Sequence, residues 1–436
     1  MTDWLAALFI LNVVLCLAWM TYLFRVLSAP SLVGLTFLMI GLRYGAAAVW
    51  YWQNNPSLPI PIPGSFLYFL GATFLGYTAG ATVVASLLQF RLGEAQRHFF
   101  SQITVVDARV VRWPVFGAVL VFSVVAAIYY IGGSERTGIE MLVSHSREAV
   151  TLRDFRQEVG ATNPFSYVGF LAGQVTGPFL LMITIAMWLR TRGLVWAMLA
   201  LGLVVLIFLA ATMSLSKAPI IVVALYVMLA VFVGRWDGGR VRLTHVVAPA
   251  GLVLALGSLG YVLTYGKSAA HALEDTVDRL VVVPLVSVHG FLHVYPDLVP
   301  FQNGLGIGTI AKLADVSGYV SPSLVVGTVI AGQGVCADSI WSVDLWANFG
   351  WPGVILGSAG VGGILAFLEY WCLLQSRTVV SVAVYAFLLG ATTRLAEGSI
   401  FTMLLSGGLV LVPVLGWFLD RSWHARKTLE PAGAFR

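Results

Sequence analysis

The stretch GVCADSIWSVDLWANFGWPGVILGSAGVGG, residues 334–363, joins a long polar region to an apolar segment of membrane-helix length. The polar region that it closes, 266–350, is the longest part of the chain in which the hydropathy pattern predicts no membrane-spanning helix. It also carries many of the ionisable groups that lie outside the predicted spans. A chain that gathers such groups in one large loop is expected to work at the membrane surface.

The composition excludes an ordinary soluble protein. Of the 436 residues, 59% are hydrophobic and 10% are charged, and the mean hydropathy is +0.89, whereas soluble domains carry about 25% charged residues. The sequence therefore predicts an all-α, polytopic membrane protein with a single integral membrane domain over 1–436. No basic run is interleaved with aromatic residues, so nucleic-acid binding is not expected. Three cysteines are too few for a disulfide framework, and the N-terminal apolar segment is expected to be retained, because no cleavage site follows it.

Apolar segments of about 20 residues predict about eleven membrane-spanning helices. Arginine and lysine concentrate in alternate loops, which the positive-inside rule places in the cytoplasm. The N-terminus is then expected outside and the C-terminus inside, and 266–350 becomes a large extracytoplasmic loop. The predicted spans are 4–24, 31–52, 66–90, 114–131, 167–189, 194–214, 219–234, 246–265, 351–374, 379–396 and 400–419.

A second outer loop, 132–166, carries charges of both signs. Thr151 followed by Asp154 resembles a capping box and predicts a short helix. Arg153 and Arg156 are three residues apart and would share one face of that helix. Such a face could grip phosphate, because guanidinium matches phosphate with two parallel hydrogen bonds. A salt-bridged surface helix explains the same pattern, and both interpretations stay open.

The hairpin MSLSKAPIIVV, 213–223, places Lys217 at the expected start of a helix. Pro219 is favoured at the first helical position, and Ser214 or Ser216 can act as the cap. Free amides and the helix dipole attract anions at this position. The pattern favours an anion site at Lys217 over a lysine that only snorkels to the membrane surface.

Within the large loop, the segment 271–295 has the apolar spacing of an amphipathic helix that lies along the membrane interface. An interruption is expected at Pro284. His289 and His293 are four residues apart and would share a face, but no third ligand lies at metal-binding spacing. No metal site is therefore expected, and the simpler interpretation is a pair of interfacial or core histidines.

Three charged residues fall inside or beside the predicted spans. Arg43 lies in the middle of the second span, where an unpaired charge costs roughly 2.5–3.5 kcal/mol. It must face the interior of the helix bundle and find a partner there. Arg394 and Glu397 are three residues apart at the outer end of the tenth span and could pair with each other.

The layout and two motifs resemble the O-antigen and exopolysaccharide repeat-unit polymerases and, more distantly, the O-antigen ligases. The shared layout is about a dozen helices with one dominant outer loop in the C-terminal half. The segment SLSKAPIIVVALYVML, 214–229, is similar to the family's Ser-Arg or Ser-Lys element at the outer start of an apolar helix. The segment DSIWSVDLWANFGWPGVILGSAGVGGIL, 338–365, is similar to its loop-to-helix passage, which ends in Phe-Gly-x-x-Gly and a glycine-rich turn. Lys217 stands where many relatives have arginine, and lysine meets phosphate only as a point charge.

The resemblance implies a GT-C-like fold and a glycosyltransferase without metal or cofactor on the outer face of a bacterial inner membrane. Its donor would be a glycan on undecaprenyl diphosphate, and its acceptor would be the sugar of another lipid-linked repeat unit. Membrane lipids and a chain-length regulator would be further partners. An O-antigen ligase acting on lipid A–core and a lipid-linked oligosaccharide flippase stay open as alternatives. A flippase is expected to carry charges along a central path between helices, whereas most charges here lie outside the predicted spans.

The implied chemistry needs two kinds of side chain. Cations must stabilise the departing diphosphate, and a general base must take the proton of the acceptor hydroxyl. We expect Arg153 or Arg156, together with Arg279, to converge near Lys217, although Arg279 beside Asp278 could be a surface ion pair. The candidate cations are Lys217, Arg279, Arg147, Arg153, Arg156 and Arg394, and the candidate bases are His289, His293, Asp338 and Glu397.

Overall fold

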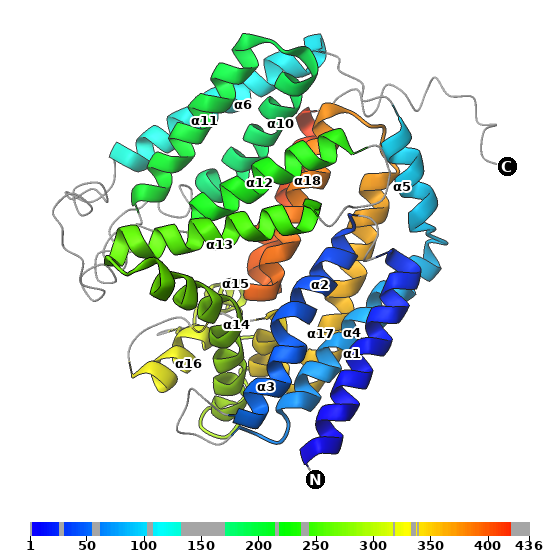
Figure 1. Cartoon of the computed structure of the whole chain (residues 1–436), viewed down its shortest axis with the longest axis vertical. Helices are drawn as coiled ribbons and strands as arrows, with labels where there is room; N and C mark the ends of the chain where they lie inside the picture. Colours follow the sequence, from blue (N-terminus) through cyan, green and yellow to red (C-terminus); the bar gives the residue numbers. More distant parts are fainter. Residues whose placement is uncertain are drawn as a thin grey trace. The chain divides into compact units, whose positions relative to one another are not determined.

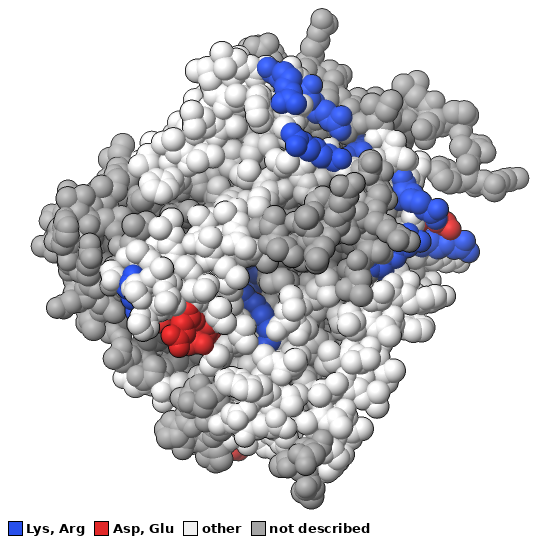
Figure 2. All heavy atoms as spheres, in the orientation of Figure 1, with Lys and Arg blue, Asp and Glu red and all other residues white. Residues whose placement is uncertain are grey.

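The structure is a computed structural model, and helices make up most of the residues that it describes (Figure 1). These residues are 2–25, 30–54, 62–102, 108–131, 171–213, 218–236, 244–316, 319–332, 337 and 340–419. Over these ranges there is no β-strand, and 6 helices are long and apolar enough to cross a membrane. The chain is therefore an all-helical, polytopic membrane protein, as the sequence predicts. Most of the described surface in view is uncharged, as membrane embedding requires (Figure 2).

The six helices of membrane-spanning length and composition include five of the predicted spans. They are Trp4–Phe24, Leu32–Asn54, Phe66–Leu87, Ala269–Val294, Trp341–Leu373 and Val379–Glu397. The prediction that no helix of this kind lies within 266–350 is wrong, because Ala269–Val294 meets the criterion. The total of eleven spans stays a prediction.

The chain forms two compact units, of which the first contains Met1–Gln96, Val277–Trp371 and Ala391–Met403. Glycines bring two of its helices, α4 (Phe66–Leu87) and α17 (Trp341–Leu373), into direct backbone contact. A Cβ atom at Gly80 would lie 1.8 Å from the carbonyl oxygen of Ala359, and one at Gly362 would lie 2.1 Å from that of Tyr77. The segment 357–363 is thus part of a helix and not the expected glycine-rich turn, because its small residues form a helix–helix contact of the kind common in membranes. The helices of this unit's first segment are α1 (Thr2–Phe24), α2 (Leu32–Tyr44), α3 (Ala46–Asn54) and α4 (Phe66–Leu87).

The second predicted span is interrupted near its middle. Ser31 caps α2, since its Oγ accepts a hydrogen bond of 2.9 Å from the amide of Gly34. Gly45, with φ −82° and ψ −102°, separates α2 from α3. A Cβ atom there would lie 2.3 Å from the carbonyl oxygen of Gly41. The break therefore depends on glycine, and it separates the short helix α3 from α2.

The region 266–350 is more helical than the sequence indicates. Helix α14 (Ala269–Val294) runs through Pro284, so the expected interruption there is wrong. Membrane helices tolerate proline where neighbouring groups satisfy the freed carbonyl. The short helices α15 (Gly308–Leu313) and α16 (Pro322–Ala331) follow. Helix α17 (Trp341–Leu373) begins ten residues before the predicted span, and Gly350, with φ 60° and ψ −145°, kinks it.

The second unit contains Arg97–Thr276, Cys372–Gly390 and Leu404–Arg436. In its core the ring of Tyr226 stacks on that of Phe387 at 4.8 Å, and a Cβ atom at Gly390 would lie 2.0 Å from the Tyr226 ring. The small residue at position 390 therefore makes room for the tyrosine. Its helices are α6 (Ala108–Ile131), the π-helix η1 (Ala172–Thr176), α10 (Gly177–Thr191), α11 (Leu194–Met213), α12 (Ala218–Arg235) and α13 (Thr244–Tyr265).

In the described part of the chain, five helices have residues in both units: α14 and α17, described above, and α5, α18 and α19. Helix α5 (Leu92–Ser101) begins in the first unit and ends in the second, and α18 (Val379–Arg394) begins in the second and continues into η2 (Leu395–Glu397). The last predicted span, 400–419, is wrong as a single helix. It consists of α19 (Ile400–Leu405) and α20 (Leu411–Leu419), and Gly408 between them has φ +89°.

Candidate functional site

Several predicted site residues lie outside the described part of the chain. They are Arg147, Arg153, Arg156, Lys217 and Asp338. The convergence of Lys217 with the arginines therefore stays a prediction. Helix α12 begins at the residue after Lys217, with Pro219 as its second residue, so a helix does start at the predicted place.

Arg43 and Glu397 form an ion pair within the first unit. The Nη2 atom of Arg43, in the last turn of α2, donates a hydrogen bond to Oε1 of Glu397, in η2. The hydroxyl of Tyr44 donates to the carbonyl oxygen of Ala396 at 2.9 Å and fastens the same two elements. Arg43 thus has the partner that its place in an apolar span requires. The spacing of Arg394 and Glu397 gave no indication of this long-range pair.

The two members of this pair differ in exposure. The Arg43 side chain is 7% exposed, whereas the Glu397 side chain is 49% exposed. Within the described residues, the buried Nη1 atom of Arg43 has no hydrogen-bond acceptor. An unsatisfied donor on a buried charged group is costly, by about 1–3 kcal/mol or more. The pair therefore combines a half-exposed carboxylate with a buried guanidinium.

Of the two candidate histidines, His289 is fully buried. Its Nδ1 lies 3.2 Å from the hydroxyl of Tyr51 on α3, and the two rings meet edge to face at 6.1 Å. This environment fits the core-histidine interpretation. His293, one turn further along α14, is half-buried, and Arg279 on the same helix is exposed.

The segment 295–307 packs along the first half of α17 and orders the motif that carries the family resemblance. The amide of Gln302 donates to the carbonyl oxygen of Ala347 at 3.0 Å, and the amide of Asn303 donates to that of Asn348 at 2.9 Å. The Asn348 Oδ1 atom also accepts from the amide of Gly306 at 2.9 Å. Hydrogen bonds from the segment 295–307 thus hold the passage 341–350 in place, and it is not a free loop.

Aromatic side chains cover the kink of this passage. The indole of Trp346 donates to the carbonyl oxygen of Tyr295 at 3.0 Å and meets the rings of Phe301 and Trp351, each at 5.4 Å. A Cβ atom at Gly350 would lie 3.2 Å from the Phe301 ring. The Phe-Gly-x-x-Gly pattern therefore needs its first glycine both for a positive φ and for contact with Phe301.

A polar group beside this kink was not predicted from the sequence. The side-chain amide of Gln302 donates to the Tyr295 hydroxyl at 3.1 Å, and the Tyr319 hydroxyl donates to the carbonyl oxygen of Gly306 at 2.9 Å. Burial raises the pKa of Tyr295 to about 12, and the charge of Asp344 adds to the shift. The pKa of Tyr319 rises for the same two reasons. Both phenols therefore remain hydrogen-bond donors near a carboxylate.

No protein-family model, curated protein or solved structure matches the chain. Across the residues that the structure describes, no group of three or more His, Cys, Asp or Glu side chains could hold a metal ion. The family resemblance thus depends on the layout and the two motifs alone.

Proposed function

We propose that the chain is a glycosyltransferase that polymerises undecaprenyl-diphosphate-linked oligosaccharide repeat units at the periplasmic face of a bacterial inner membrane. The observation that carries this function is the Arg43–Glu397 pair, in which a half-exposed carboxylate lies beside a buried guanidinium with an unused donor. About eleven spans, a GT-C-like fold, a periplasmic N-terminus and a cytoplasmic C-terminus belong to the same proposal.

The reaction needs both members of the pair. Glu397 takes the proton from the acceptor sugar's hydroxyl, whose oxygen then bonds to the anomeric carbon of the donor glycan. The bond from that carbon to the diphosphate breaks, and undecaprenyl diphosphate leaves with the electron pair. The positive charge of Arg43 stabilises the charge that develops on the diphosphate, and its hydrogen bond holds Glu397 in place.

The polar and aromatic groups around the α17 kink suit the acceptor sugar. Phe349 and Trp351 are 42% and 37% exposed, and an aromatic face packs well against the apolar face of a sugar ring. Gln302 and Asp344 supply hydrogen-bonding partners for hydroxyl groups. These residues belong to the same compact unit as Arg43 and Glu397.

The test uses purified full-length protein in proteoliposomes with undecaprenyl-diphosphate-linked repeat units. We expect a ladder of polymer and one undecaprenyl diphosphate released per linkage formed. Glu397→Gln keeps an acceptor for Arg43 but cannot take a proton, so it should abolish the ladder. The matched control is Glu94→Gln, which alters a surface pair whose side chains are 79% and 61% exposed. A full ladder from folded Glu397→Gln protein would remove Glu397 from the chemistry.

A second candidate, a lipid-linked oligosaccharide flippase, is favoured by the burial of charge within candidate spans. Besides Arg43, Glu369 on α17 is fully buried, and its carboxylate accepts from the Ser31 hydroxyl at 2.8 Å and the Val33 amide at 3.2 Å. These bonds satisfy hydrogen-bond donors at the start of α2, so Glu369 has a structural role there. In the same proteoliposomes, transfer of the lipid-linked glycan across the membrane without any polymer would favour the flippase over the polymerase.

A further inference from the structure

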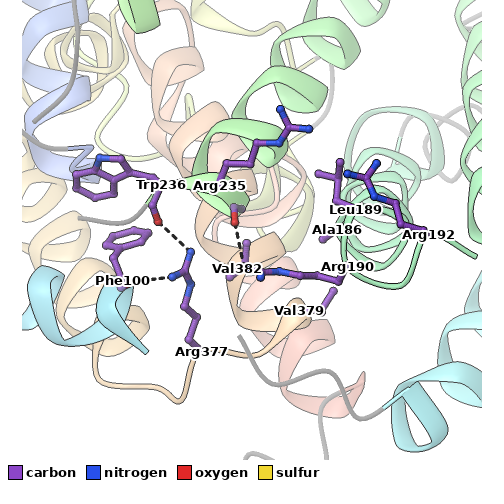
Figure 3. Close-up of a pocket in the computed structure, with 11 residues that line it drawn as sticks. Phe100, Ala186, Leu189, Arg190, Arg192, Arg235, Trp236, Arg377, Val379 and Val382 are labelled. Atoms are coloured by element: carbon purple, nitrogen blue, oxygen red, sulfur yellow. Dashed lines mark hydrogen bonds between the residues drawn. The ribbon is translucent and has the colours of Figure 1, made fainter. Parts of the chain in front are cut away.

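A cavity in the second unit is lined by four arginines that come from three separate parts of the chain (Figure 3). Its volume is about 310 Å³, at the lower end of the range for ligand pockets. Arg190 and Arg192 lie at the end of α10, Arg235 ends α12, and Arg377 precedes α18. The described residues that line the cavity include no acidic side chain.

Arg377 is the anchor of this cavity. Its side chain is buried, with the whole residue 5% exposed, and its guanidinium is held by backbone carbonyl oxygens. Nη1 donates to the oxygen of Phe100 at 2.5 Å, and Nη2 donates to the oxygen of Trp236 at 3.0 Å. The guanidinium also lies over the Phe100 ring at 5.4 Å. Arg377 therefore fixes the ends of α5 and α12 against the start of α18 and leaves a positive charge in the cavity wall.

The other three arginines line the cavity and are exposed. Nη2 of Arg190 lies 3.4 Å from the carbonyl oxygen of Gly234, a long and weak hydrogen bond. Arg192 adopts a left-handed conformation, with φ 53°, and its guanidinium lies over the Trp188 ring at 5.7 Å. These contacts orient the two side chains.

The C-terminal ends of α5, α10 and α12 meet at this cavity, and a helix C-terminus attracts cations. The four guanidinium groups give the cavity a positive lining, which attracts anions.

We propose that this cavity binds a phosphate group, carried either by an anionic lipid headgroup or by a soluble phosphate compound. Arg190, Arg192 and Arg235 contact the phosphate oxygens, for which the planar guanidinium is well suited. Arg377 is a positioning residue that holds the wall. Basic pockets between membrane helices are suited to anionic headgroups. This site shares no residue with the proposed polymerase reaction and does not depend on that function.

The test compares two charge-matched double variants of the full-length protein in detergent. Arg190→Gln/Arg235→Gln alters the cavity, whereas Arg91→Gln/Arg97→Gln removes two exposed arginines that do not line it. One arm titrates inorganic pyrophosphate at constant ionic strength and follows the shift in thermal unfolding. The other arm uses native mass spectrometry to compare retained phosphatidylglycerol with retained phosphatidylcholine.

We expect the wild type to bind at least one probe. The cavity variant should bind that probe about tenfold or more weakly, and the control variant should change the affinity less than about twofold. Binding of pyrophosphate alone identifies a soluble phosphate, and selective retention of phosphatidylglycerol identifies a lipid headgroup. Equal losses in the two double variants would show a general charge effect and overturn the site. So would a wild type that binds neither probe.

Discussion

Removing either member of the Arg43–Glu397 pair should have unequal effects on stability, because the two side chains differ in burial. Glu397→Ala leaves the buried Arg43 without its carboxylate, whereas Arg43→Met leaves a carboxylate that is already 49% exposed. An unpaired arginine at the centre of a membrane helix costs roughly 2.5–3.5 kcal/mol. A half-hydrated carboxylate loses little, about 0–1 kcal/mol, when its partner is removed. Methionine also removes the unsatisfied Nη1 donor, which reduces the loss further.

The assay is reversible unfolding of the purified protein in mixed micelles, with the free energy of unfolding measured for both single variants and the double variant. We expect Glu397→Ala to lower it by about 2–3 kcal/mol and Arg43→Met by about 1 kcal/mol or less. The double variant Arg43→Met/Glu397→Ala should be close to Arg43→Met alone, because no buried charge remains to be stranded. Equal losses from the two single variants, or a larger loss from Arg43→Met, would refute the burial argument.

Three further changes test other parts of the structure. Arg377→Lys cannot reach the same set of carbonyl oxygens and should lower the free energy of unfolding by about 1–3 kcal/mol, whereas Arg235→Lys at the exposed edge should change it little. Gly80→Ala places a Cβ atom 1.8 Å from a backbone oxygen and should destabilise by at least about 1–3 kcal/mol, while Gly41→Ala, with nothing within 4 Å, should be neutral or stabilising in the same unfolding assay. The folded-state pKa of Tyr295 is raised to about 12 from 10.0, so its contribution to stability is complete below pH 10 and is lost as the pH rises toward 12. Tyr295→Phe should therefore weaken the alkaline decline of stability, measured by unfolding at pH 9–12.

The positions of most helices could be predicted from the sequence, whereas the breaks inside apolar segments could not. A membrane span needs a continuous apolar run, and hydropathy detects that run directly. The breaks at Gly45 and around Gly408 arise where a glycine adopts a backbone conformation that other residues avoid. A hydropathy average does not register this conformational freedom. The same averaging hides α14 as a candidate span, because its first turns are charged and only the rest of the helix is apolar.

A site residue could be predicted from the sequence only where burying it without a partner would be costly. Arg43 needed a partner because its burial is costly, and that need could be stated without a structure. Its partner Glu397 lies 354 residues away in the sequence, so local spacing gave no indication of the pair. Tyr295, Gln302 and Tyr319 were missed because uncharged polar residues in a long loop carry no distinctive pattern. Their grouping depends on how 295–307 folds back on α17.

The arginine cavity constrains how often the region between α12 and α18 crosses the membrane. Arg377 donates to the carbonyl oxygen of Trp236, so the residues just after α12 and just before α18 lie at the same end of the second unit. The chain between them must therefore cross an even number of times. The predicted spans 246–265 and 351–374 would supply two crossings. Helix α14 is long and apolar enough to cross as well, but a third crossing alone would place Arg377 at the opposite end. If both predicted spans cross, the region 266–350 must return to the side from which it starts: either α14 lies without crossing, or the chain after it crosses back before α17.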